Sequence, residues 1–316
     1  MNKVKWGVLG VAKIAVEHLI PAILNASNSE LYGIASRDVE KAKTAGEKFG
    51  CRAYTGYESL LTDEQIDAVY IPLPNEMHME WTIAAAKAGK HVLCEKPLGL
   101  NVVQCEEMVK ACKENNVLLM EAFMYRYSEK TKKILEIIES GQLGEIKHIS
   151  SSFRFMLTDS SNNRFYPQGG GSLYDVGCYP INFINMITGT DPMEAFALRT
   201  DQYGVDVSFA AVLKYEGGLT ATIHSGFNSK RFLITEISGT KGVLMVTNPF
   251  LDGTKDVVLI TEEGEQVFYT KESNRYTKQI EGFADGILYG KELLMPLEDT
   301  LRNMKLIDRL YDIAIK

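Results

Sequence analysis

The chain has 316 residues, of which 45% are hydrophobic and 24% charged, and its formal charge is -7 at pH 7. These values are ordinary for a globular protein, and the length exceeds the usual size of one hydrophobic core, so two domains are expected. The acidic balance disfavours a general nucleic-acid binder, which normally carries a basic surplus. Small molecules are the expected partners.

Five scattered cysteines include no C-x-x-C pair, which disfavours a zinc site or a disulfide framework. The first residues run into a predicted strand and lack the apolar core and cleavage site of a signal peptide. No apolar run approaches the ~20 residues that a transmembrane helix needs. These features predict a cytoplasmic protein with free thiols, no metal and no membrane contact.

Through about residue 121, short apolar runs alternate with amphipathic stretches, the pattern of βαβ units. This pattern predicts a dinucleotide-binding Rossmann domain over residues 1–122, built on a doubly wound parallel sheet. The expected strands are residues 4–9, 31–36, 68–72, 91–95 and 117–121.

Beyond residue 122, one predicted helix precedes runs of alternating or β-branched residues that Gly and acidic turns separate. These runs predict a second domain, residues 123–316, of α+β type with a large, mainly antiparallel open sheet. We expect the last helix to pack back on the first domain. The expected helices are residues 128–140, 274–289 and 297–315, and the expected strands are residues 146–155, 207–215, 219–225, 233–238, 242–246, 256–261 and 265–270.

A glycine-containing turn follows the first predicted strand at Gly10-Val11-Ala12-Lys13-Ile14-Ala15. A dinucleotide fingerprint needs a tight turn and small side chains where the backbone approaches a pyrophosphate at a helix N-terminus. Only the first glycine of the fingerprint is present, and Ala12 replaces the second. A plain strand-turn-helix explains the same residues, but their place in the first βα unit favours cofactor binding.

The second predicted strand ends in Ser36-Arg37-Asp38, where an NAD-selective site usually carries an acid for the ribose 2′-hydroxyl. A hydroxyl and a guanidinium can both bond a 2′-phosphate. We therefore predict a preference for NADP(H) over NAD(H). The alternative is that Arg37 is merely exposed and that Asp38 only caps a helix.

Three residues are candidates for the chemistry: Lys96 after a strand, and Asp175 and Tyr179, which a helix would place on one face. Hydride transfer at a carbon bearing oxygen needs a group that takes or gives the hydroxyl proton. Tyrosine has a reference pKa of about 10, and a lysine ~4 Å away would favour its ionised form by on the order of 4 kcal/mol. Alternatively, Asp175 only complements the helix dipole and Tyr179 belongs to the core.

Motifs along almost the whole chain resemble the Gfo/Idh/MocA family of NAD(P)-dependent oxidoreductases. Tyr179, where many members carry His, resembles the branch of dihydrodiol dehydrogenase, glucose-fructose oxidoreductase and NADP-linked aldose (xylose) dehydrogenase. The motifs are the first turn with Ile14-Ala15, Pro74-Asn75-x-x-His78, Ala88-Gly89-Lys90-His91-Val92-Leu93-Cys94-Glu95-Lys96-Pro97, Glu121-Ala122-Phe123-Met124-Tyr125-Arg126, and Gly169-Gly170-Gly171-Ser172-Leu173-Tyr174-Asp175-Val176-Gly177-Cys178-Tyr179.

The resemblance implies that Lys96, Asp175 and Tyr179 are catalytic and that Pro97 is often cis. It implies substrate contacts at Arg126 and Arg164, and Asn182 could add a polar group for a sugar. The cofactor-binding residues that motifs and resemblance indicate are Gly10, Ala12, Lys13, Ile14, Ser36, Arg37, Pro72, Asn75, His78, Glu95 and Lys96.

The sequence thus predicts an NADP(H)-dependent oxidoreductase acting on a sugar, polyol or related secondary alcohol or carbonyl. Tyr179 would be the acid/base and Lys96 its assistant, in a homodimer or homotetramer. Two alternatives stay open: a non-catalytic dinucleotide-binding regulator of the same family, and a reductase of a non-sugar carbonyl or enone.

Overall fold

The computed structural model describes residues 3–167, 170–251, 257–271 and 274–315. The chain divides into unit 1, residues 1–127 with 274–300, and unit 2, residues 128–273 with 301–316. The sequence-based boundary after residue 122 stays a prediction. Gly169 of the glycine motif and Asp256 of a predicted strand lie outside the described residues.

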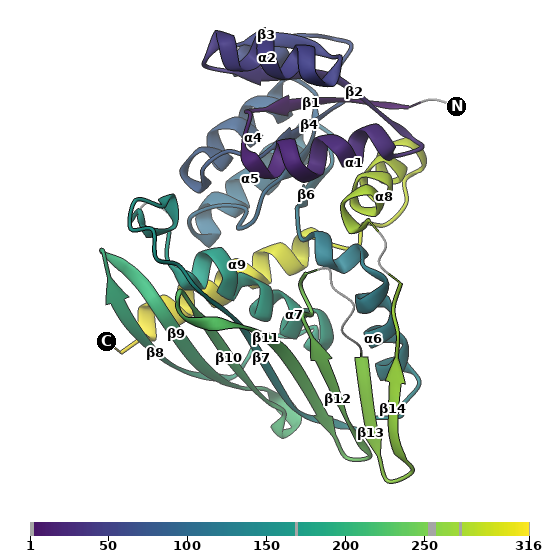
Figure 1. Ribbon diagram of the computed structural model, residues 1–316, viewed down its shortest axis with the longest axis vertical. Coiled ribbons are helices and arrows are strands. Elements are labelled where there is room, and N and C mark those ends of the chain that lie inside the picture. Colours follow the sequence, from purple (N-terminus) through teal and green to yellow (C-terminus); the bar gives the residue numbers. More distant parts are fainter. Residues whose placement is uncertain (1–2, 168–169, 252–256, 272–273, 316) are drawn as a thin grey trace. The chain divides into compact units, whose positions relative to one another are not determined.

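Unit 1 is built on a six-stranded parallel sheet in the order β3-β2-β1-β4-β5-β6 (Figure 1). This is the doubly wound order, with its switch point between β1 and β4, so the predicted Rossmann sheet is confirmed. Edge strand β3 was missed because its residues are mostly exposed and form no apolar run. The strands are β1 Val4–Leu9, β2 Ser29–Ser36, β3 Arg52–Thr55, β4 Ala68–Ile71, β5 His91–Cys94 and β6 Leu119–Glu121.

The helices of unit 1 begin and end at residues with clear local signals. Helix α2 starts after Asp38, whose side chain accepts a hydrogen bond from the backbone N–H of Lys41, and it ends at Gly50, where φ is 67°. Helix α8 packs on α1 and places Phe283 against Trp6 of β1. The helices are α1 Ile20–Asn25 after a π-helical turn at Ala15–Leu19, α2 Val39–Phe49, α3 Tyr57–Leu61, α4 His78–Lys87, α5 Val102–Glu114 and α8 Arg275–Tyr289, with 3-10 turns at Asn75–Met77 and Met124–Tyr127.

Unit 2 is built on an eight-stranded sheet in the order β14-β13-β12-β11-β7-β10-β9-β8. All neighbours are antiparallel except β7 and β10, so the predicted mainly antiparallel sheet is confirmed. Edge strand β8 was missed because most of its side chains are exposed. The strands are β7 Ile146–Met156, β8 Glu194–Gln202, β9 Val205–Lys214, β10 Thr220–Gly226, β11 Asn228–Gly239, β12 Gly242–Thr247, β13 Val257–Thr261 and β14 Gly264–Phe268.

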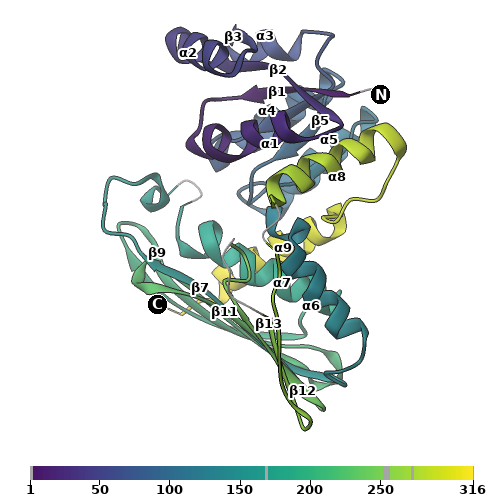
Figure 2. The ribbon, with the colours of Figure 1, turned by 45° about the vertical axis from the view of Figure 1, so that its right-hand side comes forward.

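Helices cover one face of this sheet, as Figure 2 shows for α6 and α7. The last helix packs there through Tyr311, whose ring lies 5.6 Å from that of Phe209 in β9. The alternation in β9 shows the two faces: Ala211 and Leu213 are buried, whereas Val212 is 49% exposed. The helices are α6 Glu129–Glu139, α7 Cys178–Thr188 after a π-helical turn at Leu173–Gly177, and α9 Leu297–Ile313, with 3-10 turns at Asn163–Phe165 and Glu216–Gly218.

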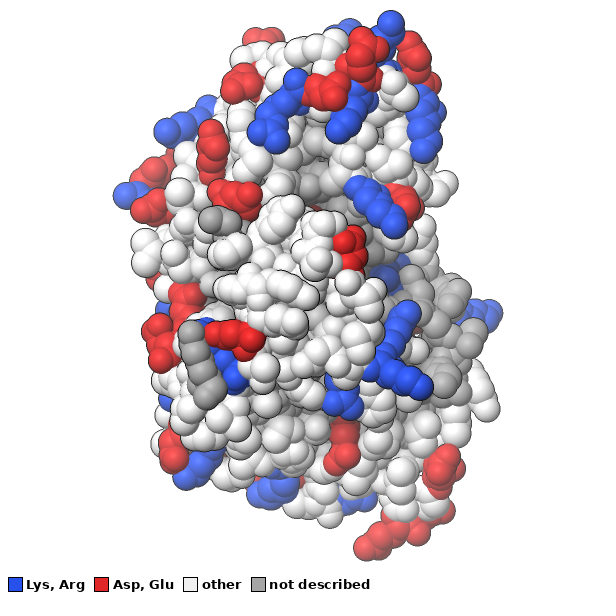
Figure 3. All heavy atoms as spheres, turned by 60° about the vertical axis from the view of Figure 1, so that its left-hand side comes forward, with Lys and Arg blue, Asp and Glu red and all other residues white. Residues whose placement is uncertain are grey.

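Charges of both signs are interspersed on the face that Figure 3 draws. Among the described residues, no helix is both long and apolar enough to cross a membrane. The five cysteines are unpaired thiols, as expected.

Candidate functional site

Lys96 lies in a loop of residues 95–98, called here the Lys96 loop, which directly follows β5 in unit 1. Buried groups hold this loop on both sides of Lys96. The Tyr70 hydroxyl donates to Glu95 Oε1 over 2.6 Å, and the Leu98 N–H donates to Glu121 Oε1 over 3.0 Å. The Lys96–Pro97 peptide bond is cis, as the family resemblance implied. The Lys96 backbone is therefore fixed from β4 and β6, the strands beside β5.

His78 ties the Lys96 loop to the loop after β4. The side chain is fully buried; Nδ1 lies 3.0 Å from the Pro97 carbonyl oxygen and Nε2 lies 2.8 Å from that of Leu73. Burial lowers the pKa of His78, while hydrogen bonds with backbone groups oppose that shift. These contacts give His78 a role in shaping the loops; its contact with a cofactor stays a prediction.

Glu121, at the end of β6, is a buried acid that sequence reasoning did not single out as a site residue. Its side chain accepts the Leu98 N–H, and the residue is 2% exposed. Burial raises the pKa of Glu121 to about 7, against the opposing effects of the Thr300 hydroxyl, the Leu98 N–H, Arg126 and Lys96. The signal was present in the sequence, because an acid directly follows the apolar end of a strand.

The turn after β1 is tight at Gly10, a feature that dinucleotide-binding turns share. Gly10 has φ 113°, and a Cβ there would lie 3.1 Å from Leu73 Cδ2, so a larger residue would be strained and crowded. The helical segment after this turn begins at Lys13, which is exposed, whereas Ala12 and Ile14 are partly buried. The chain can therefore offer backbone N–H groups to a pyrophosphate.

The end of β2 suits a 2′-phosphate. The Asp38 N–H donates to Ser36 Oγ over 3.1 Å, which leaves the Ser36 hydroxyl proton available to a ligand. Arg37 is exposed, and within the described part of the chain no carboxylate pairs with it. The residues present therefore fit an NADP-type cofactor.

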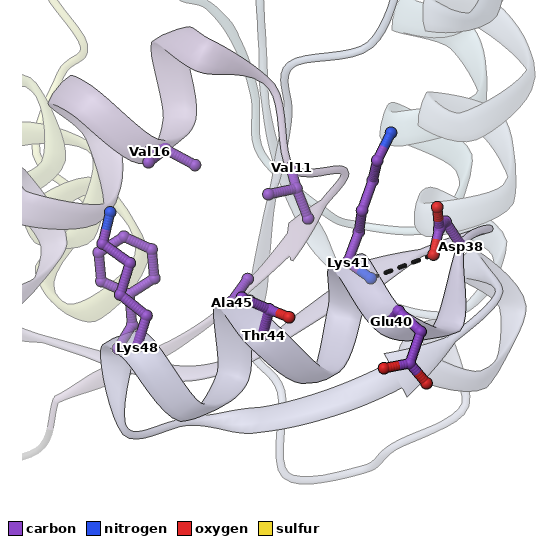
Figure 4. A pocket seen from close by; sticks show the side chains of 9 residues that line it. Val11, Val16, Asp38, Glu40, Lys41, Thr44, Ala45 and Lys48 are labelled. Atoms are coloured by element: carbon purple, nitrogen blue, oxygen red, sulfur yellow. Dashed lines mark hydrogen bonds between the residues drawn. The ribbon is translucent and has the colours of Figure 1, made fainter.

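A cavity of about 360 Å³ lies next to this strand end, between the first turn and α2 (Figure 4). Val11 and Val16 line one side, and Thr44 and Ala45 of α2 line the other. Lys41, which the sequence analysis did not single out, also lines it and adds a positive charge close in sequence to Arg37.

In unit 2, Asp175 and Tyr179 lie on one continuous helical segment. Asp175 is in the π-helical turn and Tyr179 in the first turn of α7. Arg164 Nε donates to Asp175 Oδ2 over 2.5 Å, and Asp175 raises the pKa of Arg164, with a smaller contribution from Tyr179. The structure thus gathers Arg164, Asp175 and Tyr179, as the spacing of the last two predicted.

Aromatic rings surround Tyr179, which is 6% exposed. The ring centroids of Phe153 and Phe250 each lie 5.5 Å from that of Tyr179. The ring therefore lies against an apolar wall, and the phenol interacts electrostatically with Arg164. Such surroundings keep bulk water from most of the ring.

Asp206, at the start of β9, anchors the N-terminal end of this segment. Its Oδ2 accepts hydrogen bonds from Ser172 Oγ at 2.7 Å and from the Leu173 N–H at 2.9 Å, and its Oδ1 accepts one from the Tyr311 hydroxyl. Gly171 has φ 100°, and a Cβ there would clash with Oδ1. Close packing against Asp206 thus explains the glycine at position 171, whereas Asp206 itself was not foreseen.

Two predicted substrate contacts lie in well-packed surroundings. Arg126 is 5% exposed, and its Nη1 donates to Asp299 Oδ2 over 2.7 Å and to the Leu294 carbonyl over 2.8 Å. Asn182 is fully buried in α7. Their substrate contacts stay predictions.

Comparison with known families decides the identity of the fold. Residues 4–123 match the family described as "Oxidoreductase family, NAD-binding Rossmann fold", and residues 131–245 match the "GFO/IDH/MocA C-terminal domain". This chain belongs to the Gfo/Idh/MocA oxidoreductase family. Unit 1 is accordingly an NAD(P)-binding Rossmann unit.

Three relatives in this family cover from 80 to 99% of this chain. D-xylose 1-dehydrogenase (NADP(+)) 2 of Haloferax volcanii is 37% identical, with 98% of this chain and 97% of that protein covered. Trans-1,2-dihydrobenzene-1,2-diol dehydrogenase of Xenopus tropicalis is 30% identical over 80% of this chain and 78% of its own length. The crystal structure of KijD10, a 3-ketoreductase from Actinomadura kijaniata in complex with NADP and TDP-benzene, has a TM-score of 0.92 at 32% identity, covering 99% and 98% of the two chains. The resemblance to the dihydrodiol and xylose dehydrogenase branch is thereby confirmed.

Proposed function

We propose that this oxidoreductase moves hydride between NADP(H) and a carbon bearing oxygen in a sugar, polyol or related alcohol or carbonyl. The observation that carries the proposal is the grouping of Arg164, Asp175 and Tyr179 on and beside one helical segment. That grouping offers a phenol, a carboxylate and a guanidinium to a polyhydroxylated substrate. The activities named for the relatives above support this substrate class and CH–OH chemistry.

Each of these residues has a distinct part in the proposed reaction. NADP(H), when bound, supplies or accepts the hydride. Tyr179 gives the hydroxyl proton during reduction and takes it during oxidation. Lys96 favours the ionised phenol by its positive charge. Asp175, oriented by Arg164, accepts a hydrogen bond from a substrate hydroxyl and so orients it.

The direct test measures formation of reduced cofactor by its absorbance, with NADP⁺ and NAD⁺ side by side. The panel contains aldoses, inositols and a trans-dihydrodiol, and keto sugars and enones are tried with NADPH in reverse. Turnover of a sugar or dihydrodiol with NADP⁺ supports the proposal. Turnover of an enone alone favours a reductase of non-sugar carbonyls or enones. No turnover of any compound, despite tight NADPH binding, favours the non-catalytic regulator.

Arg37→Ala is expected to weaken NADPH binding by about ten-fold or more and NADH binding by less than about two-fold. The substitution removes the guanidinium and with it a charge-assisted hydrogen bond to the 2′-phosphate, which NADH lacks. Fluorescence titration with both cofactors measures the effect. Lys43→Ala, which removes an exposed cation of α2 outside the cavity lining, is the matched control. Equal weakening of both cofactors by Arg37→Ala would refute the 2′-phosphate role.

We further propose a cytoplasmic homo-oligomer that pairs through the sheet face of unit 2 opposite α6 and α7. This face exposes apolar side chains that a second copy would cover. Light scattering after size exclusion should give at least twice the monomer mass. Phe196→Asp with Val212→Asp should reduce that mass, whereas Tyr269→Asp, outside the strands, should not. A monomeric wild type contradicts the proposal. The apolar residues are Phe196, Leu198, Val212, Phe232 and Ile260, exposed by 42 to 52%.

A further inference from the structure

Glu121 is a buried carboxyl whose hydrogen bonding is incomplete. Oε1 accepts the Leu98 N–H at 3.0 Å, whereas among the described residues Oε2 accepts no hydrogen bond of good geometry, although the Thr300 hydroxyl is near enough to favour the carboxylate. An incompletely bonded carboxyl in a protein interior costs stability, since water would satisfy both oxygens. A buried acid at this place therefore calls for a role beyond local stability.

The Glu121 carboxyl interacts with the side chains of Arg126, Thr300, Cys94 and Lys96. Arg126 of the turn after β6 is a nearby cation, and its Nη1 donates to Asp299. Thr300 of α9 brings a hydroxyl, and Cys94 at the end of β5 brings a thiol whose pKa is raised chiefly by burial and further by Glu95 and Glu121. Lys96 is the cation that belongs to the loop held by Glu121. The carboxyl therefore contacts the backbone of the Lys96 loop and interacts electrostatically with its functional side chain.

We propose that Glu121 is a positioning residue for Lys96, which holds the Lys96 loop through the Leu98 N–H and keeps the lysine side chain protonated. The two effects act together, because the same carboxylate accepts the backbone hydrogen bond and supplies the negative charge. The consequence for turnover rests on the proposed function of Lys96. The anchoring and the charge effect do not, and they can be measured without substrate.

The protonation of Glu121 adds a pH dependence with a definite sign. Burial raises the pKa of Glu121 from 4.5 to about 7, so the folded chain binds this proton more tightly than the unfolded chain. The resulting contribution to stability is complete below pH 4.5 and is lost as pH rises through about 7. Above that pH the carboxylate is ionised and acts on Lys96 most strongly.

The test is competitive acetylation of Lys96 in Glu121→Gln, read by mass spectrometry against the exposed Lys87 as internal reference. Only the neutral amine reacts, so loss of the carboxylate should speed Lys96 labelling by about ten-fold at about pH 8. Glu107→Gln, an exposed acid on α5, removes the same charge and should leave the rate unchanged. An unchanged Lys96 rate in a folded Glu121→Gln protein overturns the proposal.

The wild-type protein supplies a second measurement should Glu121→Gln fail to fold. Its Lys96 labelling rate, followed across pH, should depart from a single titration with an inflection near the pH where a labelled Glu121 carboxyl carbon titrates by NMR. If the Lys96 labelling rate follows a single titration, with no inflection at the pH where Glu121 titrates, the proposal is overturned. In the folded variant, kcat should fall with KM for the cofactor unchanged, and conservative Glu121→Asp should restore part of it.

These readouts separate the inference from the proposed function. Faster Lys96 labelling in Glu121→Gln with no turnover in any wild-type assay would support the positioning role and count against the enzyme. If turnover needs Lys96 but the Lys96 labelling rate does not depend on Glu121, the result would support the enzyme and refute the positioning role of Glu121.

Discussion

Tyr179→Phe is expected to lower kcat by about 10² to 10⁴-fold while NADPH binding stays within about two-fold. The substitution removes only the hydroxyl, and the ring keeps its contacts with Phe153 and Phe250, so the fold and the apolar wall should persist. Steady-state turnover with the best substrate of the panel, beside fluorescence titration of NADPH, measures both quantities. Because the phenol is the proposed proton donor and acceptor, the loss should fall on kcat.

Tyr269→Phe is the matched control, because Tyr269 is 80% exposed and lies outside the described strands and helices. It should turn over at the wild-type rate. If Tyr179→Phe retained more than about a tenth of kcat, another group would have to move the proton, and the assignment of the acid/base would be wrong. If both cofactor binding and turnover were lost, the result would report misfolding, which circular dichroism would show.

The strands that carry apolar runs could be predicted from the sequence, since burial on both faces of a parallel sheet leaves a continuous apolar signature. β1 and β4 show this: described residues of both are almost entirely buried. β3 and β8 lie at sheet edges, where most of their side chains are exposed to solvent and form no apolar run. Such strands are specified by pairing with a neighbour, and local pattern does not reveal that pairing.

The candidate site was foreseeable in part for a similar reason. The four-residue spacing of Asp175 and Tyr179 predicted that a helix carries both, and one continuous helical segment does carry them. Arg164 reaches Asp175 from a separate 3-10 turn, and Asp206 reaches Ser172 from a distant strand. These contacts depend on how the chain folds back on itself, so only the structure shows that Asp206 anchors the start of the helical segment that carries Asp175 and Tyr179.

Lys96→Met is expected to lower kcat on the order of 10³-fold, since a lysine charge near a phenol is worth on the order of 4 kcal/mol to its ionised form. Methionine keeps the unbranched apolar stem and removes the ammonium. The backbone of the Lys96 loop should stay in place, because Tyr70, His78 and Glu121 hold its neighbours through hydrogen bonds in which the ammonium takes no part. When turnover is measured across pH, Lys96→Met should fall furthest below the wild type at those pH values at which the wild-type reaction uses an ionised Tyr179.

Substitutions of two other lysines serve as controls for Lys96→Met. Lys87→Met changes an exposed residue at the end of α4 and should leave kcat unchanged. Lys90 lies in the same motif as Lys96, but its Nζ donates to the carbonyls of Asp63 and Ile66 at 2.8 Å each. Lys90→Met should therefore lower the thermal midpoint and spare kcat per folded molecule. A Lys96→Met protein that behaved like Lys90→Met would place Lys96 among the structural residues and leave Tyr179 without its proposed assistant.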